Sequence, residues 1–142
     1  MEAVLLENFR IYLIHNNPEL ILMHGSGYSL TDYIAEKMNS VRPLMNQLIA
    51  DGHPDYLVSL ICHSKLIEDL RPSKANYIRA ILEAQFPQDT FRMKEYGVLT
   101  YGLVNLIALC NPLFQAYGFS EINQENSDLK TEIITVIHDH LA

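Results

Sequence analysis

Cysteine and basic residues are both scarce in this sequence of 142 residues. Only Cys62 and Cys110 are present, which is too few for the disulfide framework of a small secreted domain. We therefore expect a reducing, cytoplasmic location. Lys and Arg number 10 against 17 acidic residues, for a formal net charge of −7. This balance argues against nucleic acid or an anionic membrane as a partner, because both bind a basic surface.

Long hydrophobic runs are missing as well. The most apolar stretch, residues 98–110, contains Thr100 and Asn105 and is shorter than the roughly 20 residues that span a bilayer. The N-terminus carries Glu2 and lacks the basic segment that precedes a signal sequence. We therefore expect neither a signal peptide nor a transmembrane helix.

The composition is that of a folded protein. Apolar residues make up 49% and charged residues 19% of the chain, and the length suits one hydrophobic core. No repeat and no long linker interrupts it. The sequence predicts a single domain over residues 1–142.

Apolar residues recur at helical spacing between breaks marked by Pro and Gly, and no segment alternates as a strand would. This pattern predicts an all-α fold, a compact multihelical bundle of about six helices. The expected helices cover approximately residues 2–15, 30–50, 54–70, 73–86, 89–110 and 127–141.

Three details of these helices can be tested. Residues 89–110 are apolar nearly all round beyond Val98, which predicts a central helix that ends at Asn111-Pro112. Pro43 predicts a kink or break in the second helix. The inward side chains expected for the central helix are Leu103, Leu106 and Ile107, and those for residues 54–70 are Leu57, Leu60, Ile61, Ser64 and Ile67.

Catalytic and cofactor motifs are absent from the sequence: it has no nucleophile elbow, Walker loop or Cys-x-x-Cys. His138-Asp139-His140 resembles a metal-binding dyad, but side chains two residues apart on a helix diverge, and histidines also suit a helix C-terminus. The side chains of the adjacent residues Cys62 and His63 also diverge, so they do not form a nucleophile–base pair. His24-Gly25-Ser26-Gly27 has neither the preceding strand nor the lysine of a phosphate loop. We predict no catalytic residue, no metal site and no cofactor.

One candidate anion-binding site remains at the start of the fourth helix. Arg71, Ser73 and Lys74 lie in the only mildly basic block of the chain, residues 65–94. Exposed amides at a helix N-terminus favour an anion, and these side chains could add donors. The alternative is that Ser73 only caps the helix while Arg71 and Lys74 are solvated.

Two function hypotheses follow from these observations. The first is a non-enzymatic helical interaction module with a protein partner or a second copy of itself, because many apolar helices accompany no catalytic motif. The second is a small ligand-binding protein or enzyme with a site assembled from dispersed residues. Candidates for such a site are His15, His63, Tyr101 and Glu132.

Nearly the whole chain takes part in a resemblance to a known family. The residues that carry it are Tyr12-Leu13, Asn17-Pro18-Glu19-Leu20, Leu66, Leu70, Ser73-Lys74, Ile78, Leu82, Phe86, Leu109-Cys110, Phe114, Tyr117, Leu129 and Thr131-Glu132. With these residues the chain resembles a family of Bacteroidetes hypothetical proteins classed as a domain of unknown function. It departs from the family at Asp69, Pro72, Ala75-Asn76 and Thr135. The resemblance implies a small helical protein and no particular activity.

Overall fold

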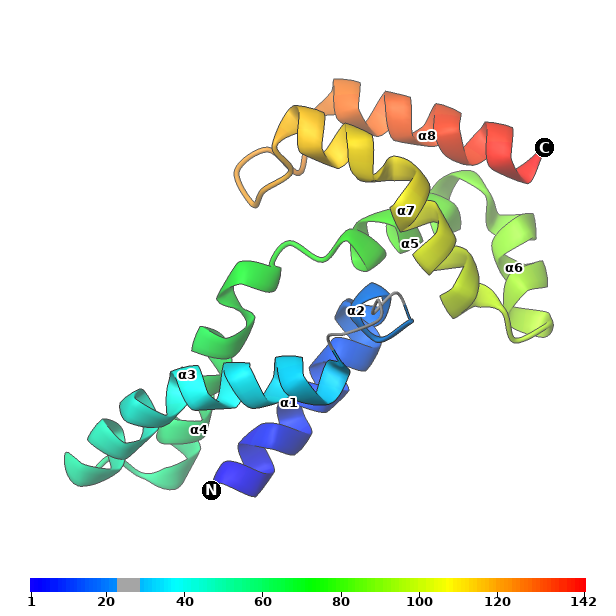
Figure 1. Ribbon diagram of the computed structural model, residues 1–142. Helices are drawn as coiled ribbons and strands as arrows, with labels where there is room; N and C mark the ends of the chain where they lie inside the picture. The colour runs from blue at the N-terminus through cyan, green and yellow to red at the C-terminus, as the bar shows by residue number, and fades with distance from the viewer. Residues whose placement is uncertain (23–28) are drawn as a thin grey trace. The chain divides into compact units, whose positions relative to one another are not determined.

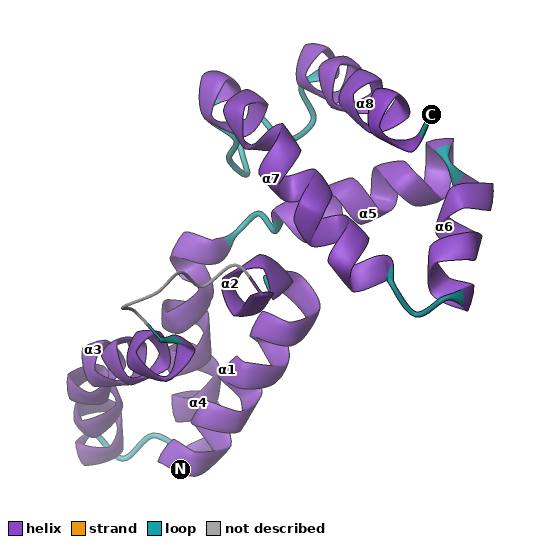
Figure 2. Cartoon of the chain, turned by 45° about the vertical axis from the view of Figure 1, so that its right-hand side comes forward, coloured by secondary structure: helices purple, strands orange, loops and turns teal. Residues whose placement is uncertain are grey.

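The computed structural model describes residues 1–22 and 29–142, and all their regular secondary structure is helical (Figure 2). The predicted all-α class is therefore confirmed. The expected count of about six helices is too low, since the described residues form eight α-helices and one 3-10 turn. The segment His24-Gly25-Ser26-Gly27 lies outside the described residues.

The chain divides into two compact units, Met1–Leu70 and Arg71–Ala142. Each unit has its own cluster of buried apolar side chains. We describe each unit by itself, and the single domain over residues 1–142 stays a prediction.

The first unit is built around α4 (Asp55–Ile67), which packs against both α1 (Glu2–Asn16) and α3 (Leu30–Ala50) (Figure 1). Buried side chains recur every three or four residues on each helix, so that each presents one apolar stripe to the others. The core consists of Leu5, Phe9, Leu13, Ile34, Met38, Val41, Met45, Val58, Cys62 and Leu66. The short helices α2 (Pro18–Leu22) and η1 (Glu68–Leu70) complete the unit.

The inward face predicted for α4 is wrong. The structure buries Val58, Cys62 and Leu66 and leaves Leu60 60% exposed. The observed stripe is offset by about one residue, which rotates the helix by roughly 100°. Apolar residues occur around most of the circumference of α4, so the sequence pattern alone did not determine which side meets α1 and α3.

Two prolines of this unit lie in or at the start of helices. Of the kink or break predicted at Pro43, the break does not occur, because α3 is continuous from Leu30 to Ala50. Pro43 is exposed, while Val41 and Met45 beside it are buried and hold both halves of the helix in the core. Pro18 begins the short helix α2, which we did not predict, at the first helical position that suits proline. Ser29 caps α3, since its hydroxyl accepts a hydrogen bond from the Asp32 amide at 3.1 Å.

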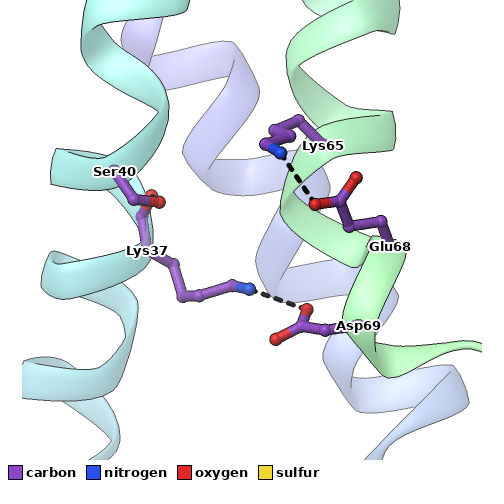
Figure 3. A network of polar contacts seen from close by, with 5 residues as sticks. All are labelled: Lys37, Ser40, Lys65, Glu68 and Asp69. Carbon is purple, nitrogen blue, oxygen red and sulfur yellow. Dashed lines mark hydrogen bonds and ion pairs between the residues drawn. The ribbon is translucent and has the colours of Figure 1, made fainter.

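A small polar network lies where α3 meets the end of the first unit (Figure 3). Lys37 on α3 pairs with Asp69 of η1 at 2.8 Å, and Lys65 pairs with Glu68 at 2.8 Å. Asp69, Lys65 and Glu68 are more than half exposed, so water screens both pairs and they add little to stability. The buried stripe of α3, rather than these ion pairs, holds the unit together.

The second unit is built around α7 (Leu99–Tyr117), which packs against α5 (Lys74–Gln85), α6 (Pro87–Glu95) and α8 (Ser127–Leu141). Leu103, Leu106 and Ile107 are each 1% exposed, so the prediction that they are nearly fully buried is confirmed. The other core residues are Ala75, Ile78, Ile81, Leu82, Cys110, Phe114, Leu129, Ile133 and Ile137.

The single helix predicted over residues 89–110 is in fact two. Gly97 has a φ of +69°, a backbone conformation open to glycine, and it separates α6 from α7. The expected end of the helix at Asn111-Pro112 is also wrong, because α7 continues through Pro112 to Tyr117. Pro112 is exposed and Phe114 beyond it is buried, so core packing carries the helix past the proline. Gly118, with a φ of +60°, ends it.

Because α7 extends to Tyr117, it is longer than the apolar stretch considered from the sequence, and its length has to be compared again with that of a membrane-spanning helix. Among the described residues, α7 alone is long and apolar enough to cross a bilayer, by length and composition only. Six of its side chains are buried in the second unit. The core helix of a soluble protein meets the same length and composition test.

Candidate functional site

The side chains with most potential for recognition gather in a groove between α1 and α4. The groove has a volume of about 500 Å³. From α1 it is lined by Asn8, Ile11, Tyr12, His15 and Asn16, and from α4 by Tyr56, Ser59, Leu60 and His63. On each helix these positions recur every three or four residues, so each set forms one stripe beside the buried stripe. We call this feature the α1–α4 groove.

The α1–α4 groove mixes apolar, aromatic and uncharged polar side chains with two histidines. None of its nine lining residues is Lys, Arg, Asp or Glu, although such residues make up 19% of the chain. Three large side chains that line it are accessible: Ile11 is 46%, Tyr56 is 75% and Leu60 is 60% exposed. Exposed apolar side chains that gather at one groove are a candidate place for another molecule to bind.

His63 is the polar group set most deeply into this groove. Its ring packs edge-on against Tyr12, with 5.6 Å between centroids, and its Nδ1 is buried with no hydrogen-bond partner among the described residues. Burial lowers the pKa of His63 below its usual value of 6.5, so the ring is neutral at pH 7. An unpaired acceptor costs less than an unpaired buried N–H, which favours the tautomer with its proton on Nε2. The groove therefore holds a neutral imidazole.

Of the four dispersed candidate residues named from the sequence, the structure brings only two together in one groove. His15 and His63 both line the α1–α4 groove, whereas Tyr101 and Glu132 belong to the second unit. Glu132 accepts a hydrogen bond from the Tyr117 hydroxyl, which raises the pKa of Tyr117 to about 12. Tyr101 is 61% exposed on α7. The sequence analysis missed Ile11 and Tyr56 altogether, and it placed Leu60 in the core.

At the predicted anion site, the capping role of Ser73 is confirmed. α5 begins at Lys74, and the Ser73 hydroxyl accepts a hydrogen bond from the Asn76 amide at 3.1 Å. Arg71 is exposed as expected and lies 3.6 Å from a carboxylate oxygen of Glu121.

Lys74, which we expected to be solvent-exposed, is instead half-buried. Its Nζ donates to Asn111 at 2.9 Å and lies 5.4 Å from the ring centroid of Phe114, so both partners are on α7. The aliphatic stem of Lys74 gains packing there and its ammonium gains a cation–π contact. Anion binding by Arg71, Ser73 and Lys74 stays a prediction.

The cysteines and the C-terminal histidines are far less suited to chemistry. Cys62 and Cys110 are fully buried, and burial raises the pKa of the Cys110 thiol to about 11, which suppresses its thiolate. His138 and His140 are exposed on the last turn of α8. Over residues 1–22 and 29–142, no three His, Cys, Asp or Glu side chains are grouped as metal ligands would be.

Comparison of this chain with protein-family models, with curated proteins and with solved structures gives no match. Its function must be inferred from its own residues.

Proposed function

We propose that the protein is a cytoplasmic helical interaction module, and that the α1–α4 groove binds the apolar face of an amphipathic helix on a partner protein. The main support is that Ile11, Tyr56 and Leu60 are exposed and line one groove that contains no Lys, Arg, Asp or Glu. Without a lysine or arginine, this lining offers little electrostatic attraction to nucleic acids or acidic substrates.

A partner helix fits the spacing of the groove. The two lining stripes lie on neighbouring helices, and an amphipathic helix can set apolar side chains at i, i+3, i+4 and i+7 between them. Asn8, Asn16 and Ser59 at the same surface can donate and accept hydrogen bonds at the edge of such an interface. The proposed partner is another protein, and a second copy of the chain is the alternative occupant. Membership of the Bacteroidetes family of unknown function stays a proposal as well.

Site-specific photo-crosslinking in the native cell tests this function. We expect a benzophenone amino acid at position 56 to capture a partner segment whose apolar residues are spaced three or four apart. The matched control is the same amino acid at position 96, because Tyr96 is 76% exposed, much like Tyr56 at 75%. The change Leu60→Glu should abolish the crosslink, since it puts an unpaired charge into the interface.

The crosslinked products separate the possible occupants. Peptides of this same chain at position 56 would identify a homodimer in place of a partner protein. Equal capture at positions 56 and 96, or capture unaffected by Leu60→Glu, would contradict the proposal.

A second candidate function is supported by His63. Its neutral ring and the neighbouring His15 give the groove the two dispersed residues expected of a small-ligand site. A thermal-shift screen against uncharged metabolites tests this function, because a ligand of the folded state raises its melting temperature. A hit whose effect disappears in His63→Gln but persists in His53→Gln would favour it over helix binding.

A further inference from the structure

The second unit has a cleft of its own, with a volume of about 400 Å³, that is unlike the α1–α4 groove. It lies beside α5 and is lined by Ser73, Tyr77 and Ile81 from the α5 side and by Gln124, Glu125 and Lys130 from the α8 side. All of these residues belong to one unit. The cleft therefore combines an apolar wall with polar and charged groups.

Tyr77 leaves an unmet hydrogen bond at this cleft. Its ring is held by edge contacts to Phe114 and Phe119, at centroid distances of 5.8 and 5.0 Å, so the side chain is fixed. Its hydroxyl is nevertheless buried and has no hydrogen-bond partner among the described residues. Buried hydroxyls are paired in nearly all proteins, and this one is available for a hydrogen bond with a bound group.

Two opposite charges border the same cleft without neutralising each other. Glu125 and Lys130 are both exposed, and neither forms an ion pair within the described part of the chain. The Glu125 carboxylate is near enough to Tyr77 to add to the effect of burial in raising the pKa of that phenol. Tyr77 and Glu125 thus line the same cleft.

Glu125 and Lys130 together determine which ligand charges the cleft can accommodate. A simple anion would pair with Lys130 but be repelled by Glu125, and a simple cation would meet the opposite difficulty. A molecule with both an ammonium and a carboxylate satisfies both at once, and charge-assisted hydrogen bonds are the strong ones. We propose that this cleft binds a small zwitterion of the free α-amino acid class, with the carboxylate at Lys130 and the ammonium between Glu125 and the Tyr77 hydroxyl. Its side chain would lie against Ile81.

The test uses the full chain and the common free L-amino acids as probes. At least one of them should raise the melting temperature, and its N-acetyl and amide derivatives, which each lack one charge, should raise it far less. Isothermal titration should then show that Glu125→Gln and Lys130→Gln weaken binding of that amino acid at least about tenfold. Tyr77→Phe should also weaken it, because only the hydroxyl is removed. The control Glu83→Gln changes a carboxylate that pairs with Lys94 and does not line the cleft, so its affinity should equal the wild-type value.

Three results would overturn the proposal. The first is no stabilisation by any free amino acid. The second is unchanged affinity in Glu125→Gln and Lys130→Gln, which would place the ligand elsewhere. The third is equal binding of the N-acetyl derivative, which would reduce the site to an anion contact at Lys130.

Discussion

Burial changes sharply between neighbouring leucines of α7. Leu106 is 1% exposed, while Leu109, three residues further on, is 47% exposed. The two positions share a helix and a residue type, and they differ only in what surrounds the side chain. The same change at both therefore isolates the contribution of core packing.

We predict that Leu106→Ala lowers the free energy of unfolding by about 2–5 kcal/mol, through lost burial and the cavity left behind. Leu109→Ala should lower it by less than about 1 kcal/mol. Urea denaturation followed by circular dichroism measures both. Similar losses at the two positions would mean that α7 buries Leu109 as well, for example in an interface between molecules.

At the scale of the element, the best-determined feature is the start of α5. A side-chain cap satisfies an amide that the helix itself leaves unpaired. Ser73 makes this contact to Asn76 at 3.1 Å. Ser127 begins α8 in a similar position, but there the cap is Asn126, which accepts from the Leu129 amide at 3.0 Å.

We predict that Ser73→Ala destabilises the protein by about 1 kcal/mol, the usual cost of losing a cap. Ser127→Ala is the matched control and should change stability by no more than about 0.5 kcal/mol, because its hydroxyl does not cap the helix. Thermal unfolding of the two variants and of the wild type measures these changes in stability. If Ser127→Ala cost as much as Ser73→Ala, the cap at Ser73 would not be what stabilises α5.

The sequence predicts the buried face of a helix well only where the apolar residues are confined to one side of that helix. On α5 and α8 the buried residues form one apolar stripe, because polar residues fill much of the rest of each helix. The inward face of α4 was not predicted, because Leu57, Leu60 and Ile61 are as apolar as the residues that are buried. The helix breaks were also misjudged: proline was given too much weight at Pro43 and Pro112, where packing on both sides maintains the helix.

The candidate sites were predictable only in part. Sequence reasoning named His15 and His63 but had no means to place them together, since the α1–α4 groove exists only once α1 packs on α4. It named Ser73 and Lys74 correctly as the start of a helix. The partner of Lys74 is Asn111, 37 residues away, and no local pattern announces a contact over that separation.

At the scale of the whole molecule, burial of His63 makes the stability of the fold depend on pH. The folded pKa of His63 is lowered by burial, so between that value and 6.5 the unfolded chain binds the proton more readily. His63 therefore makes its full contribution to the free energy of unfolding above about pH 6.5. That contribution is lost as the pH falls from 6.5 through the pKa of His63 in the folded protein.

We predict that the wild type loses more stability than His63→Gln between pH 7.5 and 5.5, a window that lies above the titration of ordinary carboxyl groups. His15→Gln is the control, because His15 lines the same groove but is exposed. It should show the pH dependence of the wild type. Urea midpoints at each pH measure the slopes, and a comparison of slopes remains valid even if the substitution alters stability at every pH. Parallel slopes for the wild type and His63→Gln would show that His63 is as well solvated when folded as when unfolded, and the groove would then lack the desolvated imidazole that its geometry indicates.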